Sequence, residues 1–529
     1  MSLPDSSQAP LFAAANELPD LLPEDDPMII FSRVIYPSFH DQDFEACYSE
    51  SGRPAISPAF LACVTLLQFR ENLSDSETAA AVIRRLDWKI ALHLPVWENT
   101  SFDPSTLCYF RRRLKENGKM RLIFDKTVEV AKRYNFIRKN TNQRIDATHI
   151  VSHVNRISTT DLLFRTVRCV MEEIEKVAEE IYSEYVAEYL KERYGNRFSS
   201  FGMSKEKRQH RQAEIVEDGF LLRSLLEEHC GEDIEEFKQL KIMETIFEEN
   251  VVIKKKAIED KDVIEVEEIR SPKQTIFDPR DVSLKLGRKG KCSWIGSKCH
   301  VVETAERGKI NFITDMIYQP ANGHDGNIHD QVFSGNEQAG LEPQKVFADS
   351  NYLSGELIKQ YRDHGQELMG YMQGYAGREK AFQTEAFKID IKNRQAVCPA
   401  GHGSIKSGCE KPDNITIYFD SKTCRECEFF HQCVQMNNKS ATRRKLTIRP
   451  FYEYRRERRL AQETDWFRDE MRVRAQVEGT ISEGTRFHGL RYARYRGGDG
   501  HQFQFYQTGA AINVKRLAKA ISRADKEDE

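Results

Sequence analysis

Three acidic residues stand in sequence contexts that single them out as candidates for chemistry. Asp146 lies in the middle of RIDATHI, a segment with the alternation of a β-strand, where an aspartate is unfavourable. Asp349 ends the predicted strand KVFAD, and Glu478 lies in the predicted helix MRVRAQVEGTISE. Strand ends and a packed helix can bring such residues together although they are far apart in the chain. Because Mg²⁺ prefers oxygen ligands, the three carboxylates are candidates for a divalent-metal site.

Such a set suits an in-line displacement at phosphorus. Two divalent ions about 3.5–4 Å apart can stabilise the attacking and the leaving oxygen. Like charges held this close are destabilising without metal, so a cluster of them would indicate function. Other acids compete for these places, namely Asp278, Asp281, Asp315, Asp330 and Glu356 for the first two, and Glu470 and Glu483 for the third.

Four of the twelve cysteines have the spacing of a second kind of metal site. The pattern is C-x25-C-x2-C-x5-C, formed by Cys398, Cys424, Cys427 and Cys433. Four thiolates that include one C-x2-C pair suit a tetrahedral, structural Zn²⁺. The spacing also fits an iron–sulfur cluster, and reduced buried cysteines are the alternative without a metal. Alternative ligands are Cys409, His402 and His431.

Composition and charge narrow the class of protein. The 529 residues are 30% charged and 40% hydrophobic, which is typical of a globular chain of two to four domains. No apolar run is long enough to span a membrane and no leader is recognised, so we expect a cytosolic protein without a disulfide framework. The net charge of −3 conceals two basic stretches, 111–144 and 443–496, balanced by acid-rich segments around 172–190 and 226–268. The basic stretches are either phosphate-binding surfaces or solvated helix faces.

The first part of the chain is predicted to be helical. Residues 1–25 are polar, contain prolines and are expected to be disordered, and residues 26–138 form the predicted helical domain. Its helices are expected over 56–72, 73–92 and 103–117, with Ser57 opening the first helix and Ser74 or Asp75 capping the second. The last helix carries Arg111, Arg112 and Arg113. Short helices that end in a basic one are typical of a helix-turn-helix module, which places a helix in the DNA major groove.

A change of hydrophobic period near residue 143 marks a second region, 139–520. Its predicted order is strand, helical insert over about 158–270, hairpin, strand, helix and strand. This order predicts an α/β fold with a mixed sheet and helices around it. A cysteine-rich insert with little periodic structure covers about 390–445, helices follow over 451–482 and 509–524, and residues 521–529 are expected to be a tail.

The three acids and their surroundings resemble a known family. Asp146 in RIDATHI, Asp349 in VFADSNY and Glu478 in RAQVEG are similar to the DDE transposases of bacterial insertion sequences. The similarity is to the branch with an N-terminal helical domain, a long helical insert after the first aspartate and a cysteine-rich segment before the glutamate. The segments SGRPAISP and GLRYARYRG, the latter followed by AAINVKR, also resemble that branch, and the resemblance extends over residues 28–517.

One motif of the family is only partly present. In many relatives the glutamate belongs to a Tyr-x2-Arg-x3-Glu-x6-Lys signature, whose members share a helix face. Arg474 matches the arginine, but Met471 stands at the tyrosine place and Thr485 at the lysine place, with Arg486 one residue later. These departures affect the roles of the tyrosine and lysine and leave the three acids intact.

The resemblance implies an RNase H-like core in which Asp146, Asp349 and Glu478 hold two Mg²⁺ or Mn²⁺ ions. It implies cleavage of DNA at the ends of the element and strand transfer into target DNA. The implied partners are double-stranded DNA, both terminal inverted repeats and target, and a second copy of the chain in the complex that pairs the two ends. The implied location is the bacterial cytoplasm, in association with the nucleoid and not with a membrane. The expected DNA-contacting residues are Arg111, Arg112, Arg113, Arg474 and Arg486.

Two other functions remain open from the sequence. A domesticated, non-catalytic DNA-binding protein would explain Met471 and Thr485. An RNase H-like nuclease that cuts without strand transfer would keep the same three acids.

Overall fold

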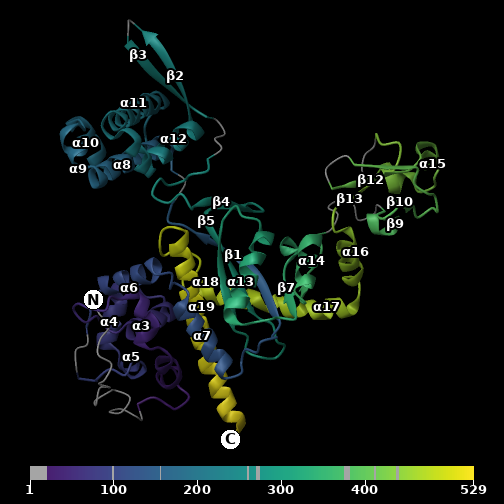
Figure 1. The fold of residues 1–529 in the computed structure, drawn as a ribbon, viewed down its shortest axis with the longest axis horizontal. Coiled ribbons are helices and arrows are strands. Elements are labelled where there is room, and N and C mark those ends of the chain that lie inside the picture. The colour runs from purple at the N-terminus through teal and green to yellow at the C-terminus, as the bar shows by residue number, and fades with distance from the viewer. Residues whose placement is uncertain are drawn as a thin grey trace.

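The computed structural model describes residues 21–97, 101–154, 157–258, 261–269, 274–373, 382–409, 413–435 and 440–528. Most of the segment expected to be disordered, 1–20, lies outside the described residues. Three parts extend from a central sheet: a group of N-terminal helices, a helical insert, and a small β-rich part at the far end of helix α16 (Figure 1). Among the helices of the described ranges, none has the length and apolar character needed to cross a membrane.

The central sheet is mixed, as the sequence predicts. Its strands are β1 (Gln143–Val151), β4 (Lys285–Lys289), β5 (Cys292–Thr304), β6 (Ile313–Pro320), β7 (Lys345–Phe347) and β8 (Glu367–Met369). The order is β6–β5–β1–β7–β8, with β4 paired to the first residues of β5. Strand β1 runs antiparallel to β5 and parallel to β7, and β7 runs parallel to β8.

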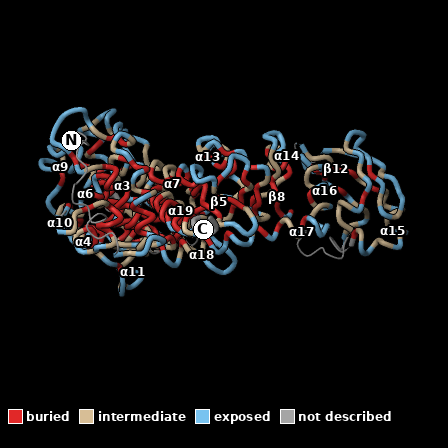
Figure 2. Tube along the Cα trace, turned by 90° about the horizontal axis from the view of Figure 1, so that it is seen from below, coloured by how far each residue is buried: buried red, intermediate tan, exposed pale blue. Residues whose placement is uncertain are grey.

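Helices cover both faces of this sheet. Side chains alternate along a strand, so Val301 of β5 packs into one core and Val302 into another. The first core is shared with α3 (Pro58–Glu71), α7 (Leu122–Arg133) and α19 (Gly498–Asp528), and the second with α13 (His329–Ala339) and α14 (Gly355–Asp363). Helix α19 lies between the sheet and the N-terminal helices, where buried residues are dense (Figures 1 and 2).

The N-terminal helices confirm the helical prediction. They are α2 (Pro27–Ile30), α3, α4 (Asp75–Arg84), α5 (Leu86–Ala91), α6 (Ser105–Glu116) and α7, with short π and 3-10 turns between Phe31 and Cys47. Ser57 accepts a hydrogen bond from the Phe60 amide, and Ser74 forms a capping box with Glu77. These side chains satisfy amides that the first helical turn leaves without partners, which fixes where each helix begins.

The insert folds around its own core. It comprises α8 (Thr159–Val177), α9 (Glu179–Glu184), α10 (Glu188–Gly195), α11 (Lys205–Cys230), a 3-10 turn (Gly231–Glu236) and α12 (Lys238–Asn250), followed by β2 (Val251–Ile258) and β3 (Lys261–Glu268). The sequence predicts a helical insert up to about residue 270, but its last part is an antiparallel hairpin. The β-branched residues of VVI and VIEV favour strands there.

The cysteine-rich segment contains more regular structure than its sequence predicts. Its elements are a 3-10 turn (Thr384–Ala386), β9 (Lys388–Asp390), β10 (Gln395–Val397), β11 (Lys406–Gly408), β12 (Ile415–Tyr418), α15 (Ser421–Arg425), a π turn (His431–Gln435) and β13 (Lys445–Ile448). Strands β9 and β10 form one small sheet, and β11, β12 and β13 form another. Strands this short carry little periodicity, which is why the sequence did not reveal them.

Helices lead from this segment back to the central sheet. They are α16 (Tyr452–Ala461), α17 (Asp465–Met471), a 3-10 turn (Arg472–Gln476) and α18 (Val477–Phe487), as the helical pattern predicts. Helix α19 runs on to Asp528, so residues 521–528 are helical and not a tail. Ile521 packs with Ile30 and Ala518, which anchors this part of the helix.

Candidate active site

Asp146 and Asp349 come from neighbouring parallel strands. Gln143 pairs with Val346 and Arg144 with Phe347. Continuing this register by two residues places Asp349 beside Asp146, just after β7 ends. Asp349 then caps the 3-10 turn Ser350–Tyr352 and accepts a hydrogen bond from the Ser350 amide at 2.7 Å. The sheet therefore brings these two predicted site residues together.

The Asp146 carboxyl is in an environment that resists its negative charge. Burial raises its pKa above the ordinary value, and the charge of Asp349 raises it further. Two contacts partly offset this: Oδ1 accepts from the Ala147 amide at 2.7 Å, and Oδ2 accepts from Arg474 at 3.1 Å. Unfavourable charge of this kind is typical of a site that binds a cation or reacts.

Glu478 lies in the first turn of α18 and is exposed. Helix α18 packs against β1 and β5, and Arg474, one turn before Glu478, reaches Asp146. Within the ranges that the structure describes, Glu478 makes no hydrogen bond or ion pair, and no three His, Cys, Asp or Glu residues are arranged to hold a metal ion. The two aspartates are thus adjacent, with the helix of the glutamate beside them, but the three carboxylates are not gathered into one group.

The competing acids mostly have structural partners. Glu470 pairs with Lys345 at 2.5 Å, Glu483 with Lys515 at 2.7 Å, and buried Asp315 with Arg121 at 2.7 Å. The remaining ones accept hydrogen bonds from the Arg280 amide (Asp278), the Gly497 amide (Asp281) and the Gln360 side chain (Asp330), while Glu356 is exposed on α14. Glu478 therefore remains a better candidate for a ligand than Glu470 or Glu483.

The arginines expected to contact DNA occupy different environments. Arg111 has only 14% of its side chain exposed; it pairs with Asp75 and lies over the Tyr495 ring. It therefore holds α6 to α4 instead of projecting from its helix. Arg113 lies over the Tyr48 ring, whereas Arg112 and Arg486 are exposed.

One basic element near the site was not singled out from the sequence. The charge of Lys289 lowers the pKa of Asp146 and that of His149, so this lysine, in the hairpin of β4 and β5, faces the same region. Gly290 turns that hairpin with φ of 59°. The run RKGK around it was the available signal, because a glycine between basic residues marks a turn that exposes them. His149 itself stacks against Trp294 at 5.0 Å between ring centroids.

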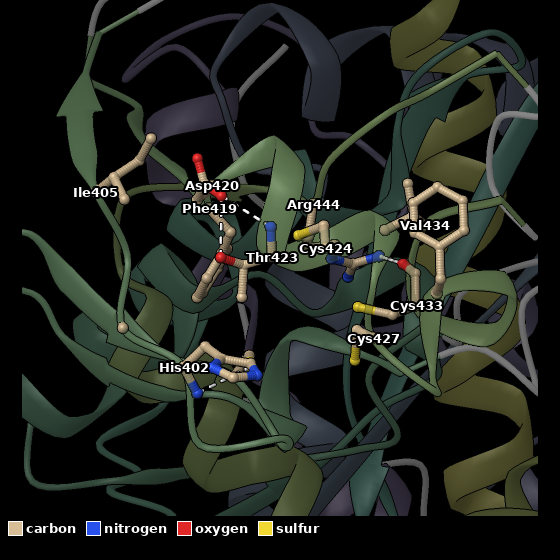
Figure 3. Close-up of a pocket in the computed structure, with 13 residues that line it drawn as sticks. His402, Ile405, Phe419, Asp420, Thr423, Cys424, Cys427, Cys433, Val434 and Arg444 are labelled. Atoms are coloured by element: carbon tan, nitrogen blue, oxygen red, sulfur yellow. Dashed lines mark hydrogen bonds between the residues drawn. The ribbon is translucent and has the colours of Figure 1, made fainter.

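A separate cavity of about 210 Å³ lies in the cysteine-rich segment. We call it the cysteine cavity; it is lined by Cys398, Cys424, Cys427 and Cys433, with His402 and Arg444 among its other lining residues. Figure 3 shows Cys424, Cys427 and Cys433 around this space with His402 across from them. Cys409 and His431 are both exposed, and neither lines the cavity.

The thiols of the cysteine cavity are close enough to influence one another. Burial raises the pKa of Cys424, and that of Cys433 to about 11, and in both cases neighbouring cysteines add to the effect. The Cys398 sulfur accepts a hydrogen bond from the His402 amide at 3.3 Å. The sequence spacing therefore identified four cysteines that share one cavity, although within the described ranges no three His, Cys, Asp or Glu residues are arranged to hold a metal ion.

Comparisons with known proteins match both ends of the chain. Residues 16–113 match a family described as a transposase domain (DUF772), and residues 397–518 match one described as a transposase DDE domain. The second match includes the cysteine cavity, Arg474, Glu478 and most of α19, but not Asp146 or Asp349. No curated protein and no solved structure matches the chain. These two matches, which lie on either side of most of the mixed sheet in the sequence, indicate an insertion-sequence DDE transposase.

Proposed function

We propose that this transposase cuts DNA at the ends of its element and joins the freed 3′-hydroxyl to target DNA, with Asp146, Asp349 and Glu478 holding two Mg²⁺ or Mn²⁺ ions. The observation that carries the proposal is the register of β1 and β7, which when continued by two residues puts Asp349 beside the half-buried carboxyl of Asp146. The strand order β6–β5–β1–β7–β8, with β5 antiparallel to β1, supports an RNase H-like core around these residues.

The donor set of the site fits divalent ions. It consists of carboxylate oxygens, two of them on residues fixed by strand pairing, and the third residue, Glu478, is exposed and able to turn toward them. Bound ions would stabilise the attacking and leaving oxygens of the displacement. Arg474 donates a hydrogen bond to one Asp146 oxygen at 3.1 Å. Once that oxygen is engaged, the guanidinium is free to bind a DNA phosphate beside the site.

Double-stranded DNA is the proposed partner, as terminal inverted repeat and as target. Arg112, Arg486 and the Lys289 hairpin offer exposed positive charge in different parts of the chain. Binding through phosphates would be strongly salt-dependent. We also propose a homodimer, since two ends must be paired, and a place in the cytoplasm with the nucleoid.

We further propose that the cysteine cavity holds a structural Zn²⁺. Four sulfurs line one cavity in a segment with little other core, and a C-x2-C pair suits tetrahedral coordination. Burial raises the pKa of the Cys424 and Cys433 thiols, so metal binding would release protons there. The strands and helix of the cysteine-rich segment, such as β12 and α15, lie far from β1 in Figure 1, which supports a structural and not a catalytic ion.

A non-catalytic DNA-binding protein is the second candidate. It is favoured by one observation: the described structure does not gather Glu478 with the two aspartates. Two observations favour the catalytic proposal instead. The Glu478 side chain has no ion pair within the described residues that would compete with a metal ion, and the pKa of Asp146 is raised.

Cleavage of DNA that carries the element's own ends tests the proposal. We expect Mg²⁺-dependent cleavage by the wild type and a loss of more than about 100-fold in Asp146→Asn, Asp349→Asn and Glu478→Gln, since even an outer partner of a metal ligand is worth 10- to 100-fold. Glu470→Gln is the matched control, because that glutamate pairs with Lys345. DNA binding should persist in all four variants.

Each other outcome points elsewhere. Activity in Glu478→Gln would mean that another residue is the third ligand. A wild type that binds the ends but never cuts in Mg²⁺ or Mn²⁺ would leave the non-catalytic candidate. Cleavage without joining of a pre-cut end to a plasmid would indicate a nuclease that lacks strand transfer.

A further inference from the structure

We propose that Glu303 is a positioning residue for the active site: with Arg144, Thr480 and Arg516 it fixes the helix that carries Glu478 against the strand that carries Asp146. The inference rests on the proposed function and adds to it a buried set of residues that neither binds metal nor touches DNA. We call these four residues the Glu303 network.

Glu303 is a fully buried carboxylate on β5, directly opposite Arg144 of β1. Its Oε1 accepts from Arg144 Nε at 2.8 Å and Nη2 at 2.7 Å. Its Oε2 accepts from Thr480 Oγ1 at 2.7 Å and from Arg516 Nη1 at 2.8 Å. A buried charge is costly unless it is paired and hydrogen-bonded. Each of the two Glu303 oxygens accepts two hydrogen bonds here. The network therefore holds Arg144, Thr480 and Arg516 in one specific arrangement around the carboxylate.

These contacts flank Glu478 on both sides. Arg144 lies two residues before Asp146 on the same strand, and its Nη1 donates to the Val473 carbonyl and to Gln476 Oε1, both at 2.9 Å. These acceptors lie just before α18 begins. Thr480, two residues after Glu478, is tied to Glu303.

Helix α19 anchors α18 from a second side through Arg516. Arg516 Nη2 of α19 donates to Thr480 Oγ1 at 2.7 Å, and its Nη1 also donates to the Asn311 carbonyl at 2.7 Å. Helix α19 packs in turn on β6 and on the N-terminal helices. The position of Glu478 is therefore set by β1 and β5 on one side and by α19 on the other.

Apolar packing alone would hold α18 weakly. Its buried residues are Val477, Thr480 and Gly484, and the half-buried Ile481 packs against the core shared with α19, so the inward face of this helix has only two bulky apolar side chains. Small side chains constrain the rotation of a helix less than interlocking large ones do. The polar contacts of Thr480 are therefore the main fixed point between Glu478 and the sheet.

The test compares Thr480→Val, which keeps the shape and removes the hydroxyl, with Thr480→Ser, which keeps the hydroxyl. The matched control is Thr166→Val in the insert, where an equally buried hydroxyl bonds only to Leu162 of its own helix. Three quantities are measured on the full chain: Mn²⁺ affinity by calorimetry, hydrogen exchange of amides 477–482 without Mn²⁺ or Mg²⁺, and cleavage of end-bearing DNA.

We expect Thr480→Val to bind Mn²⁺ and to cleave about tenfold less well, the lower end of what outer partners of metal ligands contribute. Its amides 477–482 should exchange faster, while its melting temperature and DNA binding match those of Thr166→Val. Thr480→Ser should restore all three quantities. Such a pattern separates positioning from general stability, because a merely structural role would not move metal affinity at constant melting temperature.

Two results would overturn the inference. One is Mn²⁺ affinity and cleavage in Thr480→Val equal to those of Thr166→Val. The other is unchanged exchange at 477–482, which can be read even if the wild type never cleaves. Absence of cleavage by the wild type itself would count against the proposed function and not against the network.

Discussion

The candidate active site and the cysteine cavity each contain side chains of types that can bind a metal ion, but they differ in how much structure holds those side chains. Asp146 and Asp349 extend from strands packed between two hydrophobic cores. The cysteine cavity is supported by a small cluster centred on Ile417, Phe419 and Leu446, and by strands of three or four residues. Buried residues are dense around α19 and β5 and sparse around α15 (Figure 2).

This difference separates two uses of a metal ion. A site whose ligands are already held by the fold can bind, release and exchange its ions without unfolding. A small segment whose ligands are held by little else gains part of its folding free energy from the metal. The proposed Mg²⁺ site therefore depends on the fold, whereas the fold around the cysteine cavity is expected to depend on its ion.

The largest effect should come from removing a ligand of the cysteine cavity. We expect Cys427→Ser, or a chelator, to release zinc and to unfold residues 382–450, because structural zinc contributes about 10–16 kcal/mol of apparent binding free energy in small domains. Limited proteolysis followed by mass spectrometry would locate the cuts. Cys409→Ser is the control, since Cys409 is exposed and does not line the cavity.

The central sheet should keep its melting transition in both variants. If Cys427→Ser retains the zinc content and protease resistance of Cys409→Ser, the cavity is a site of reduced thiols and the comparison fails. Iron instead of zinc in the purified protein would change the metal but leave the contrast intact.

An acid pH should also weaken the central sheet. Burial lowers the pKa of His329 to about 4, while its ring is held between the Tyr361 hydroxyl and the Tyr352 carbonyl. The unfolded chain protonates this residue first, near pH 6.5, so its contribution is present above that pH and is lost as the pH falls toward 4. One such shift corresponds to about 3 kcal/mol at low pH.

Denaturant unfolding between pH 7 and pH 4.5 measures this effect. We expect His329→Gln to have lower stability at pH 7 but a flatter pH dependence than the wild type. His210→Gln is the control, because that histidine has 80% of its side chain exposed. Equal pH slopes for the wild type and His329→Gln would show that this histidine does not make the core sensitive to acid.

The contrast between the two regions also explains what the sequence predicted well. Helices with a cap and a continuous apolar period, such as those opened by Ser57 and Ser74, follow from local rules. Asp146 and Asp349 stood out because a carboxylate in or after a strand is locally unusual. The four cysteines stood out by spacing alone.

What the sequence missed depends on contacts between distant residues. The sequence around Glu303 does not predict its ion pairs with Arg144 and Arg516. The sequence around Arg111 likewise does not predict its ion pair with Asp75. The strands β9 to β13 and the hairpin of β2 and β3 were missed because short strands become recognisable only when their partners are known. Of the features that the sequence did not reveal, the Glu303 network matters most, because we propose that it fixes the position of Glu478.

The smallest effect should be a gain in stability when Asp146 loses its charge. Burial and Asp349 raise the pKa of the Asp146 carboxyl in the folded chain. As the pH rises above the ordinary aspartate value, the unfolded chain gives up this proton first, so the wild type loses stability that Asp146→Asn retains. In buffer without Mg²⁺ and without chelator, calorimetry should show a higher melting temperature for Asp146→Asn than for the wild type at pH 7.5. The gain in the free energy of unfolding should lie within the roughly 0.5–2 kcal/mol that is usual for stabilising substitutions.

The difference in melting temperature should shrink toward pH 4. Asp330→Asn, at an exposed position, is the control and should show no such gain. A less stable Asp146→Asn would mean that the contact with Arg474 outweighs the cost of burial, and that the fold does not hold the active site in readiness for a cation.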